Sequence, residues 1–396
     1  MTRVGVLGDA FITWGGGIDF LRTITDSLGH APEAVDMHVL LPIHGPRLAI
    51  RSAVRSLIRR STGAARVGNA ITRDHVEEFI QDIQSYATVH RIDHGASAVA
   101  AIGQKLNLQG LVPAVRPLPT AFPIPWVGYL NDFQHRYYPE HFTAAERVQR
   151  DHVVSTMLQA ARSVIVNGRT VAKDAALFFP DPRAKVFPLP FSAAPQPRWL
   201  DATDHQPRPA SAPENYLITC NQFWKHKDHS TLFTAFARIA TDFPTTDLIC
   251  TGVTSDYRDP NHFPSLMQQL ERAGIQGRVH ILGMIPKLQQ IALLRNSIAL
   301  IQPTLFEGTP GGLAVFDALA LGVRCLVSDI AVNQELDEPL VTFFSASDSD
   351  SLTHALHKLL TTRAPTKPAA HTLLELGSQR RRACGAVLLE ALYAAR

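Results

Sequence analysis

Residues 298–322 read IALIQPTLFEGTPGGLAVFDALALG, which is an apolar run, an acid, a cluster of glycines and a second apolar run. The first run predicts a buried strand, and the second predicts a helix over 312–321 with Gly322 at its C′ position. In an open α/β sheet, ligands bind just beyond the carboxyl ends of the strands. Glycine amides and a helix N-terminus would meet there, and this combination favours a bound anion such as phosphate.

The same alternation of short apolar runs and helical patterns extends along the whole chain. In the first half we expect strands at 3–11, 35–43, 87–92, 110–115, 125–130 and 163–167, with helices at 18–28, 73–84, 97–108 and 143–161. In the second half we expect strands at 215–221, 246–252, 278–285, 298–304, 324–328 and 341–345, with helices at 228–243, 261–273, 288–296, 312–321 and 349–362. Continuous apolar strands between helices predict parallel sheets that are covered on both faces.

The length of 396 residues favours two domains over one. Residues 192–215 are rich in Pro, Ala and Ser and have no apolar period, so they are typical of a linker. We therefore predict a first doubly wound domain over 1–192, a linker over 193–214 and a second doubly wound domain over 215–372. The remaining residues, 373–396, predict a helix that could cross back to the first domain.

Composition excludes several classes of protein. Hydrophobic residues make up 45% and charged residues 18%, and the net charge of +3 is too small to indicate a nucleic-acid partner. The four cysteines are far apart, which speaks against a zinc site or a redox pair and suits a reducing compartment. Neither a signal-peptide layout nor an apolar run of about 20 residues is present. We expect a cytoplasmic protein, free or at the inner face of the membrane.

One basic stretch could bring the chain to a membrane. Arg47, Arg51, Arg55 and Arg59 are four residues apart, so they would share one face of a helix with apolar residues opposite. Such a helix suits peripheral contact with an anionic membrane surface. A basic face that is simply solvated is the alternative.

Two acids within 298–322 indicate what kind of ligand the glycine loop would bind. The glycine spacing fits neither the dinucleotide fingerprint nor the Walker A loop, and a plain flexible turn is the alternative. Glu307 and Asp317 would repel phosphate, but a carboxylate accepts hydrogen bonds from vicinal hydroxyls. A ligand with a central diphosphate and a hydroxylated ring at each end satisfies both features, and a nucleotide sugar is such a ligand.

The run FEGTPGGLAVFDALALGVRCLVSDI (306–330) resembles the donor-binding motif of family-4-type, group 1 retaining glycosyltransferases of bacteria. Their motif is an acid, a glycine-rich loop and a second acid on the next helix, followed by A-x-G-x-P-V-V-x-S-D. Here the acids are further apart, and the second acid is Asp rather than Glu. The resemblance implies the GT-B architecture, which has two Rossmann-like domains facing a cleft. It also implies a nucleoside-diphosphate sugar as donor, retention of configuration, and no metal or other cofactor.

Two further segments extend the resemblance. NQFWKHKDHSTLFTAF (221–236) places Lys227 at the family's diphosphate-binding Lys and Gln222 at its Arg. NDFQHRYYPEHFTAAERVQRD (131–151) places His135 at the histidine that contacts the donor sugar, the alternative being a structural histidine paired with Asp132 or Glu140.

The resemblance implies a full set of site residues. The catalytic group is His135, Glu307, which would orient the sugar, and Lys227, which would stabilise the leaving diphosphate. The donor-binding group is Gly16, Gly17, Asn221, Gln222, Lys227, Met284, Ile285, Gly308, Thr309, Pro310, Gly311, Gly312, Leu313 and Asp317, the last of which would hold the ribose. Glu335 could lie near the sugar or the ribose, or be an acid at the start of a helix.

We therefore expect transfer of a sugar to a hydroxyl of a polysaccharide, glycan or lipid-linked acceptor, as in cell-surface polysaccharide biosynthesis. A sugar-phosphate phosphorylase or epimerase, or a nucleotide-sugar-binding subunit without activity, are the alternatives. The sequence leaves the oligomeric state open. No D-x-D motif stands in a strand-end loop, because DSD at 348–350 predicts a helix cap.

Overall fold

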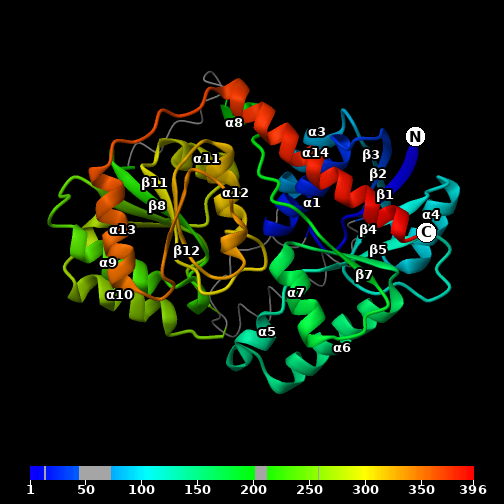
Figure 1. Cartoon of the computed structure of the whole chain (residues 1–396), viewed down its shortest axis with the longest axis horizontal. Coiled ribbons are helices and arrows are strands. Elements are labelled where there is room, and N and C mark those ends of the chain that lie inside the picture. Colours follow the sequence, from blue (N-terminus) through cyan, green and yellow to red (C-terminus); the bar gives the residue numbers. More distant parts are fainter. Residues whose placement is uncertain (13–14, 44–72, 201–211, 257) are drawn as a thin grey trace.

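The computed structural model describes residues 1–12, 15–43, 73–200, 212–256 and 258–396, and it contains two parallel sheets (Figure 1). The predicted basic helix, with Arg47, Arg51, Arg55 and Arg59, lies outside the described residues, as does half of the predicted linker. Within the described ranges, no helix is both long and apolar enough to cross a bilayer.

The first sheet has seven strands in the order β3-β2-β1-β4-β5-β6-β7. Its strands are β1 (Thr2–Leu7), β2 (Val35–Pro42), β3 (Thr88–Ile92), β4 (Gly110–Ala114), β5 (Trp126–Leu130), β6 (Ser163–Val166) and β7 (Lys185–Pro188). Every pair is parallel, as the apolar runs predict. The edge strand β7 is absent from the expected set, because four residues with an exposed lysine give no clear apolar signal.

Helices cover both faces of this sheet. They are α1 (Gly15–Gly29), α3 (Arg73–Ile83), α4 (Ala96–Lys105), α5 (Gln134–Tyr137), α6 (Ala144–Ala160) and α7 (Arg169–Phe178). Between α5 and α6 lies the short 3-10 turn η1 (Pro139–His141), and α6 begins directly afterwards. The Thr143 side chain accepts from the Glu146 amide and the Glu146 carboxylate accepts from the Thr143 amide, a capping box that starts α6.

The second sheet has six strands in the order β10-β9-β8-β11-β12-β13, again all parallel. Its strands are β8 (Tyr216–Cys220), β9 (Asp247–Thr251), β10 (Val279–Gly283), β11 (Ala299–Gln302), β12 (Cys325–Ser328) and β13 (Val341–Phe344). Its helices are α9 (His229–Ile239), α10 (His262–Arg272), α11 (Lys287–Asn296), α12 (Gly312–Ala320) and α13 (Ser349–Thr361). Gly322 follows α12 with a φ of +68°, and the Asp348 side chain caps α13, as the sequence predicts.

The predicted linker is not wholly irregular. It contains the short helix α8 (Pro197–Leu200), whose Trp199 side chain is buried against the apolar cluster of the second domain. A single buried tryptophan fixes the path of the chain without producing any apolar period in the sequence.

The last helix, α14 (Ala370–Ala394), crosses back and packs along α1 of the first domain (Figure 1). Cys384, Leu388 and Leu392 belong to the same buried cluster as the strands and α1 of that domain. The packing is close, because a Cβ on Gly385 would lie 2.1 Å from the carbonyl oxygen of Ser27. The chain therefore begins and ends in one domain and connects to the other at two places.

Candidate active site

A cleft of about 640 Å³ lies between the two domains, at the carboxyl ends of strands from both sheets. The first domain contributes α1 and the segments after β5 and β6. The second contributes the loops after β8, β9, β10 and β11, together with the start of α12. Both halves of a parallel α/β architecture thus present their ligand-binding edges to one cavity.

The glycine loop after β11 forms one wall of this cleft. Gly311 and Gly312 have φ values of +71° and +70°, a left-handed conformation that explains the two adjacent glycines. Gly308, Thr309, Gly312 and Leu313 line the cleft. The Gly312 amide donates to the carbonyl oxygen of Thr309 over 3.1 Å, and the first turn of α12, with the positive end of the helix dipole, lies at the wall of the cavity.

A network of charged and polar side chains lies beside this loop. Nζ of Lys227 lies 2.5 Å from Oε1 of Glu307, and both side chains are largely buried. Gln302 donates to the same Glu307 oxygen over 2.9 Å, and Asn221 in turn donates to Gln302 over 2.9 Å. The glycine loop that follows Glu307 and the side chain of Lys227 therefore line the same cleft.

The first domain approaches this network closely. A Cβ placed on Gly308 would lie 3.0 Å from Cβ of Asp132 and 3.1 Å from the carbonyl oxygen of Asn131. Asn131, Asp132 and Asn167 line the cleft opposite the glycine loop. The two domains thus approach each other closely beside the glycine loop.

Glu335 makes a second contact between the two domains. The carboxylate of Glu335 accepts hydrogen bonds from the amides of Arg169 (2.8 Å) and Thr170 (2.6 Å) at the start of α7. Glu335 is therefore an acid at a helix start, as one of its two alternatives predicts, but the helix belongs to the other domain. It is not among the residues that line the cleft.

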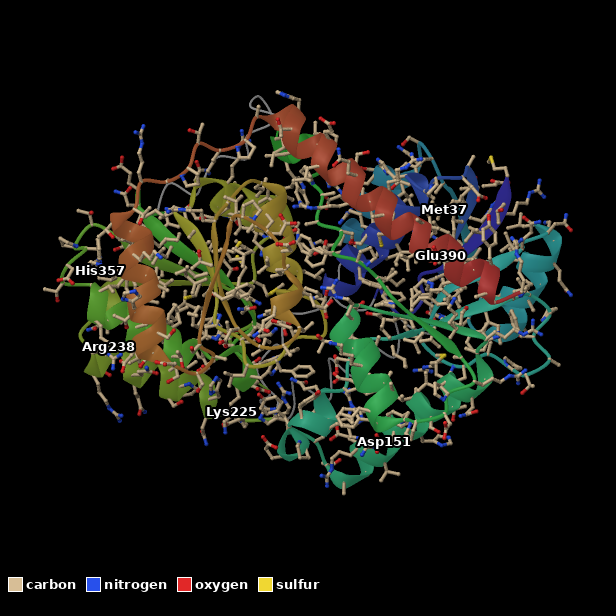
Figure 2. All side chains as sticks on the ribbon, in the orientation of Figure 1. Met37, Asp151, Lys225, Arg238, His357 and Glu390 are labelled. Atoms are coloured by element: carbon tan, nitrogen blue, oxygen red, sulfur yellow. The ribbon has the colours of Figure 1, made fainter. Side chains whose placement is uncertain are left out.

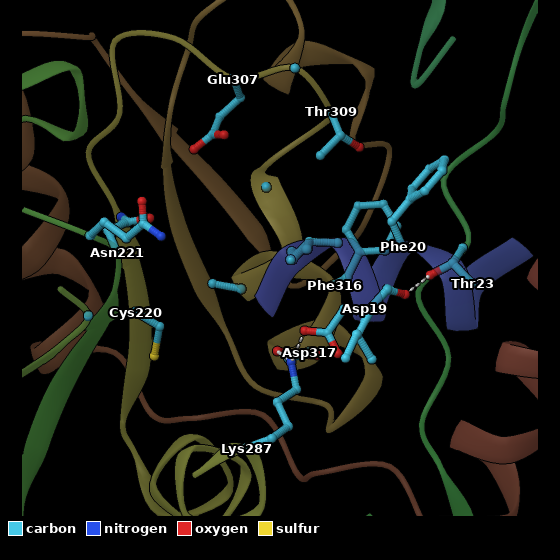
Figure 3. Close-up of a pocket in the computed structure, with 18 of the residues that line it drawn as sticks. Asp19, Phe20, Thr23, Cys220, Asn221, Lys287, Glu307, Thr309, Phe316 and Asp317 are labelled. Atoms are coloured by element: carbon cyan, nitrogen blue, oxygen red, sulfur yellow. Dashed lines mark hydrogen bonds and ion pairs between the residues drawn. The ribbon is translucent and has the colours of Figure 1, made fainter. Parts of the chain in front are cut away.

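Asp317 lies at the opposite end of the cleft from Glu307 (Figure 3). Its carboxylate is buried, and Oδ2 lies 2.6 Å from Nζ of Lys287. Burial raises the pKa of Asp317 to about 6, although Lys287 opposes that shift. The same Lys287 ammonium lies 2.9 Å from Oδ2 of Asp19 in the first domain.

The remaining predicted residues divide into two groups. Gly16, Asn221, Gln222, Met284 and Ile285 line the cleft, whereas Gly17, Pro310 and Gly311 do not. For Gly311 the reason is clear, because its amide donates to the side chain of Asn333 over 2.8 Å and so faces away from the cavity.

His135 is not brought to the cleft. Its side chain is 2% exposed, and Nε2 lies 2.9 Å from Oδ1 of Asp151 on α6 (Figure 2). The structure therefore favours the alternative in which His135 is a structural histidine rather than a contact of the donor sugar. Its partner is Asp151, however, and not Asp132 or Glu140. Because α5 is a single turn that packs against α6, the ring points into that helix pair.

Sequence reasoning missed several residues of the cleft. Asp19, Phe20, Trp199, Lys287 and Phe316 all line it. Lys287 follows the strand-end segment LGMIP, which is the one available signal. Asp19, Phe20 and Phe316 lie inside helical patterns that look like ordinary packing, and Trp199 lies in the predicted linker. Within the described part of the chain, no group of three or more His, Cys, Asp or Glu residues has an arrangement that could hold a metal ion.

Comparison with known proteins agrees with this geometry. Residues 201–373 match the family described as "Glycosyl transferases group 1". No curated protein sequence matches the chain.

Solved structures match over nearly the whole length. HepE of Anabaena, in complex with UDP and glucose, is 16% identical with a TM-score of 0.62, over 99% of this chain and 100% of that one. Sucrose-phosphate synthase of Thermosynechococcus elongatus is 16% identical with a TM-score of 0.59, over 99% and 98%. WaaG, a glycosyltransferase involved in lipopolysaccharide biosynthesis, is 12% identical with a TM-score of 0.54, over 96% and 94%. At these identities the likeness concerns the fold, which is the predicted GT-B architecture.

Proposed function

We propose that the chain, whose residues 201–373 match the group 1 glycosyl transferase family and whose fold is GT-B, is a glycosyltransferase that moves a sugar from a nucleoside-diphosphate sugar to an acceptor hydroxyl with retention of configuration. The observation that carries this proposal is the convergence of Lys227, Glu307 and the N-terminus of α12 on one interdomain cleft.

The diphosphate of the donor would lie against the glycine loop. The amides at the start of α12 would bind its oxygens, and Lys227 would neutralise the charge that grows as the diphosphate leaves. In the structure Lys227 is paired with Glu307, so the donor would exchange one anionic partner for another. Glu307 would then be available to accept hydrogen bonds from hydroxyls of the donor sugar, while Gln302 continues to donate to its carboxylate.

The nucleoside end of the donor would extend toward Asp317. Its carboxylate would accept from the ribose hydroxyls, and the segment after β10, with Met284 and Ile285, would border the base. HepE was solved with UDP-glucose, so UDP-sugars are the first donors to try.

In the reaction, the bond between the anomeric carbon and the diphosphate breaks and a bond to the acceptor oxygen forms on the same face. The acceptor proton passes to a phosphate oxygen of the leaving group, so no protein base is required. Closing the two domains would exclude water and limit hydrolysis. This mechanism uses no metal ion.

The acceptor would approach from the first domain, past Asn131, Asp132 and Asn167. A polysaccharide, glycan or lipid-linked hydroxyl remains the proposed acceptor, at the cytoplasmic face of a membrane. WaaG is involved in the synthesis of such a lipid-linked product, lipopolysaccharide, which supports this class.

The test is a panel of UDP-, GDP- and ADP-sugars, each incubated with the protein while released nucleoside diphosphate is measured. We expect release with one class of donor, and an increase when hydroxyl acceptors are added. Release that requires free phosphate would instead indicate a phosphorylase. Binding without release under any of these conditions would indicate a binding subunit and overturn the proposal.

A further inference from the structure

Lys287 connects two carboxylates that belong to different domains, the buried Asp317 and the partly exposed Asp19 (Figure 3). Its ammonium lies 2.6 Å from Asp317 on α12 and 2.9 Å from Asp19 on α1. All three side chains line the cleft at its nucleoside end. Lys287 donates to Oδ2 of Asp317, which leaves Oδ1 as the oxygen that can accept from a ribose hydroxyl.

Other charged groups surround the triad of Lys287, Asp317 and Asp19, and most of them form ion pairs with one another. Arg22 pairs with Asp19 at 3.1 Å and with Asp82 on α3 at 2.9 Å. Further out are charged pairs from α3, α8 and α14, and His75, whose charge would favour ionised Asp19. These pairs are Arg198 with Asp82 and Glu78, and Arg381 with Asp26. Lys287 is therefore the cation in direct contact with Asp317.

This arrangement has opposing effects on the carboxylates. Burial raises the pKa of Asp317, Lys287 lowers it and the negative charge of Asp19 raises it again. For Asp19 itself, burial opposes ionisation, but Lys287 and Arg22 outweigh it and hold the pKa of Asp19 below its ordinary value. Asp317 is thus the member of the triad whose charge is most easily lost.

We propose that Lys287 is a positioning residue for the donor: it keeps the Asp317 carboxylate ionised and oriented toward the ribose hydroxyls, and it shares this task with Asp19 of the first domain. The inference rests on the proposed function, because it assumes that a ribonucleotide occupies this end of the cleft. It explains why a lysine, rather than an apolar residue, lies between two carboxylates from different domains.

The test measures the dissociation constant of a nucleoside diphosphate by calorimetry between about pH 5 and about pH 8.5. This range extends about one pH unit beyond the midpoints that we expect for Asp317. In the wild type, affinity should fall as pH falls through about 6, because protonated Asp317 accepts fewer hydrogen bonds. In Lys287→Met the midpoint should rise by about one pH unit or more. At a rise of about one unit half of Asp317 is protonated at pH 7, so affinity there should fall about twofold, and by more if the rise is larger. In Asp19→Asn the midpoint should move the opposite way, since a charge that raises the pKa of Asp317 is removed.

The 2′,3′-dideoxy nucleoside diphosphate is the matched control. It has the same phosphates but lacks the ribose hydroxyls, so its pH profile should not respond to Lys287→Met. Lys287→Arg, which keeps the charge, should restore most of the wild-type midpoint, and thermal melting reports whether each variant is folded.

Two results would distinguish a failure of the proposed function from a failure of the proposed role of Lys287. If the wild type binds no nucleoside diphosphate, the proposed function fails and the role of Lys287 fails with it. If the wild type binds but both variants keep its midpoint, or shift it in the same direction, the role of Lys287 alone is overturned. Opposite shifts are the result that a merely structural salt bridge would not produce.

Discussion

Lys227 and Glu307 are 80 positions apart in the chain, yet Nζ of one lies 2.5 Å from Oε1 of the other at the floor of the cleft. The pair keeps a lysine ammonium fixed beside the start of α12 before any donor is present. A diphosphate carries more negative charge than one carboxylate, so it can displace Glu307 from this ammonium. Donor binding would thereby release Glu307 to the sugar.

Replacing Lys227 with methionine removes this ammonium while keeping most of the side-chain volume. We expect turnover of the donor sugar to fall by roughly 10²- to 10³-fold, the size of effect seen when one stabilising donor is removed from a transition state. Initial rates at saturating donor measure it. Lys225→Met is the matched control, because Lys225 is exposed on the outer surface and does not line the cleft (Figure 2). Equal rates for the two variants would contradict the role of Lys227.

Gly308 is the point where the glycine loop meets the first domain. In Gly308→Ala the new methyl group would lie 3.0 Å from Cβ of Asp132 and 3.1 Å from the carbonyl oxygen of Asn131, so this contact between the domains must widen by a few tenths of an ångström. We expect kcat/KM to fall by up to about tenfold, because misplacement by about 1 Å lowers rates about 10²-fold and this displacement is smaller. Initial rates at low donor concentration measure it. Gly277→Ala is the control, because a Cβ there meets no atom within 4 Å, and equal kcat/KM values for the two variants would refute the prediction.

His229 should make the second domain sensitive to acid. It is fully buried and stacks on Phe223 with ring centroids 4.1 Å apart, and burial lowers its pKa to about 3. The unfolded chain takes up a proton below pH 6.5 whereas the folded chain does not until about pH 3, so stability is full above pH 6.5 and is lost as pH falls through this window.

The expected slope from this one residue is about 1.4 kcal/mol of unfolding free energy per pH unit. In His229→Phe the ring stack is kept and the titrating group is gone. Between about pH 6 and about pH 4, inside that window, the unfolding free energy of the variant should therefore fall less steeply than that of the wild type, by about that slope. Urea unfolding at a series of pH values measures it. Parallel pH profiles for the wild type and the variant would show that His229 does not contribute.

The C-terminal helix should stabilise the first domain rather than the second. Leu388 on α14 is fully buried in the core of the first domain. Leu388→Ala should therefore lower the unfolding free energy of that domain by about 2–5 kcal/mol, the usual cost for such a cavity. Leu374→Ala, on an exposed part of the same helix, should change it by less than about 0.5 kcal/mol. Chemical unfolding followed separately in each domain checks this, and a loss confined to the second domain would refute it.

The fold and the main wall of the site were predictable from the sequence, because both depend on local patterns. The alternation of apolar runs and helical segments predicts two parallel sheets, and the glycines at 308–312 predict where one strand turns into a helix. Short elements such as β7 and α8 escaped, since each is four residues long and is held by contacts with distant parts of the chain.

The chain order of strands, glycines and acids by itself determined that this protein has two α/β domains and a ligand site at a strand-to-helix turn, because backbone geometry and apolar periodicity act over a few neighbouring residues. Only the tertiary structure decided that His135 turns to Asp151, that Glu335 caps a helix of the other domain, and that Lys287 lies between Asp19 and Asp317. The partner of a buried charge depends on which helices pack together across the cleft, and no local pattern contains that information.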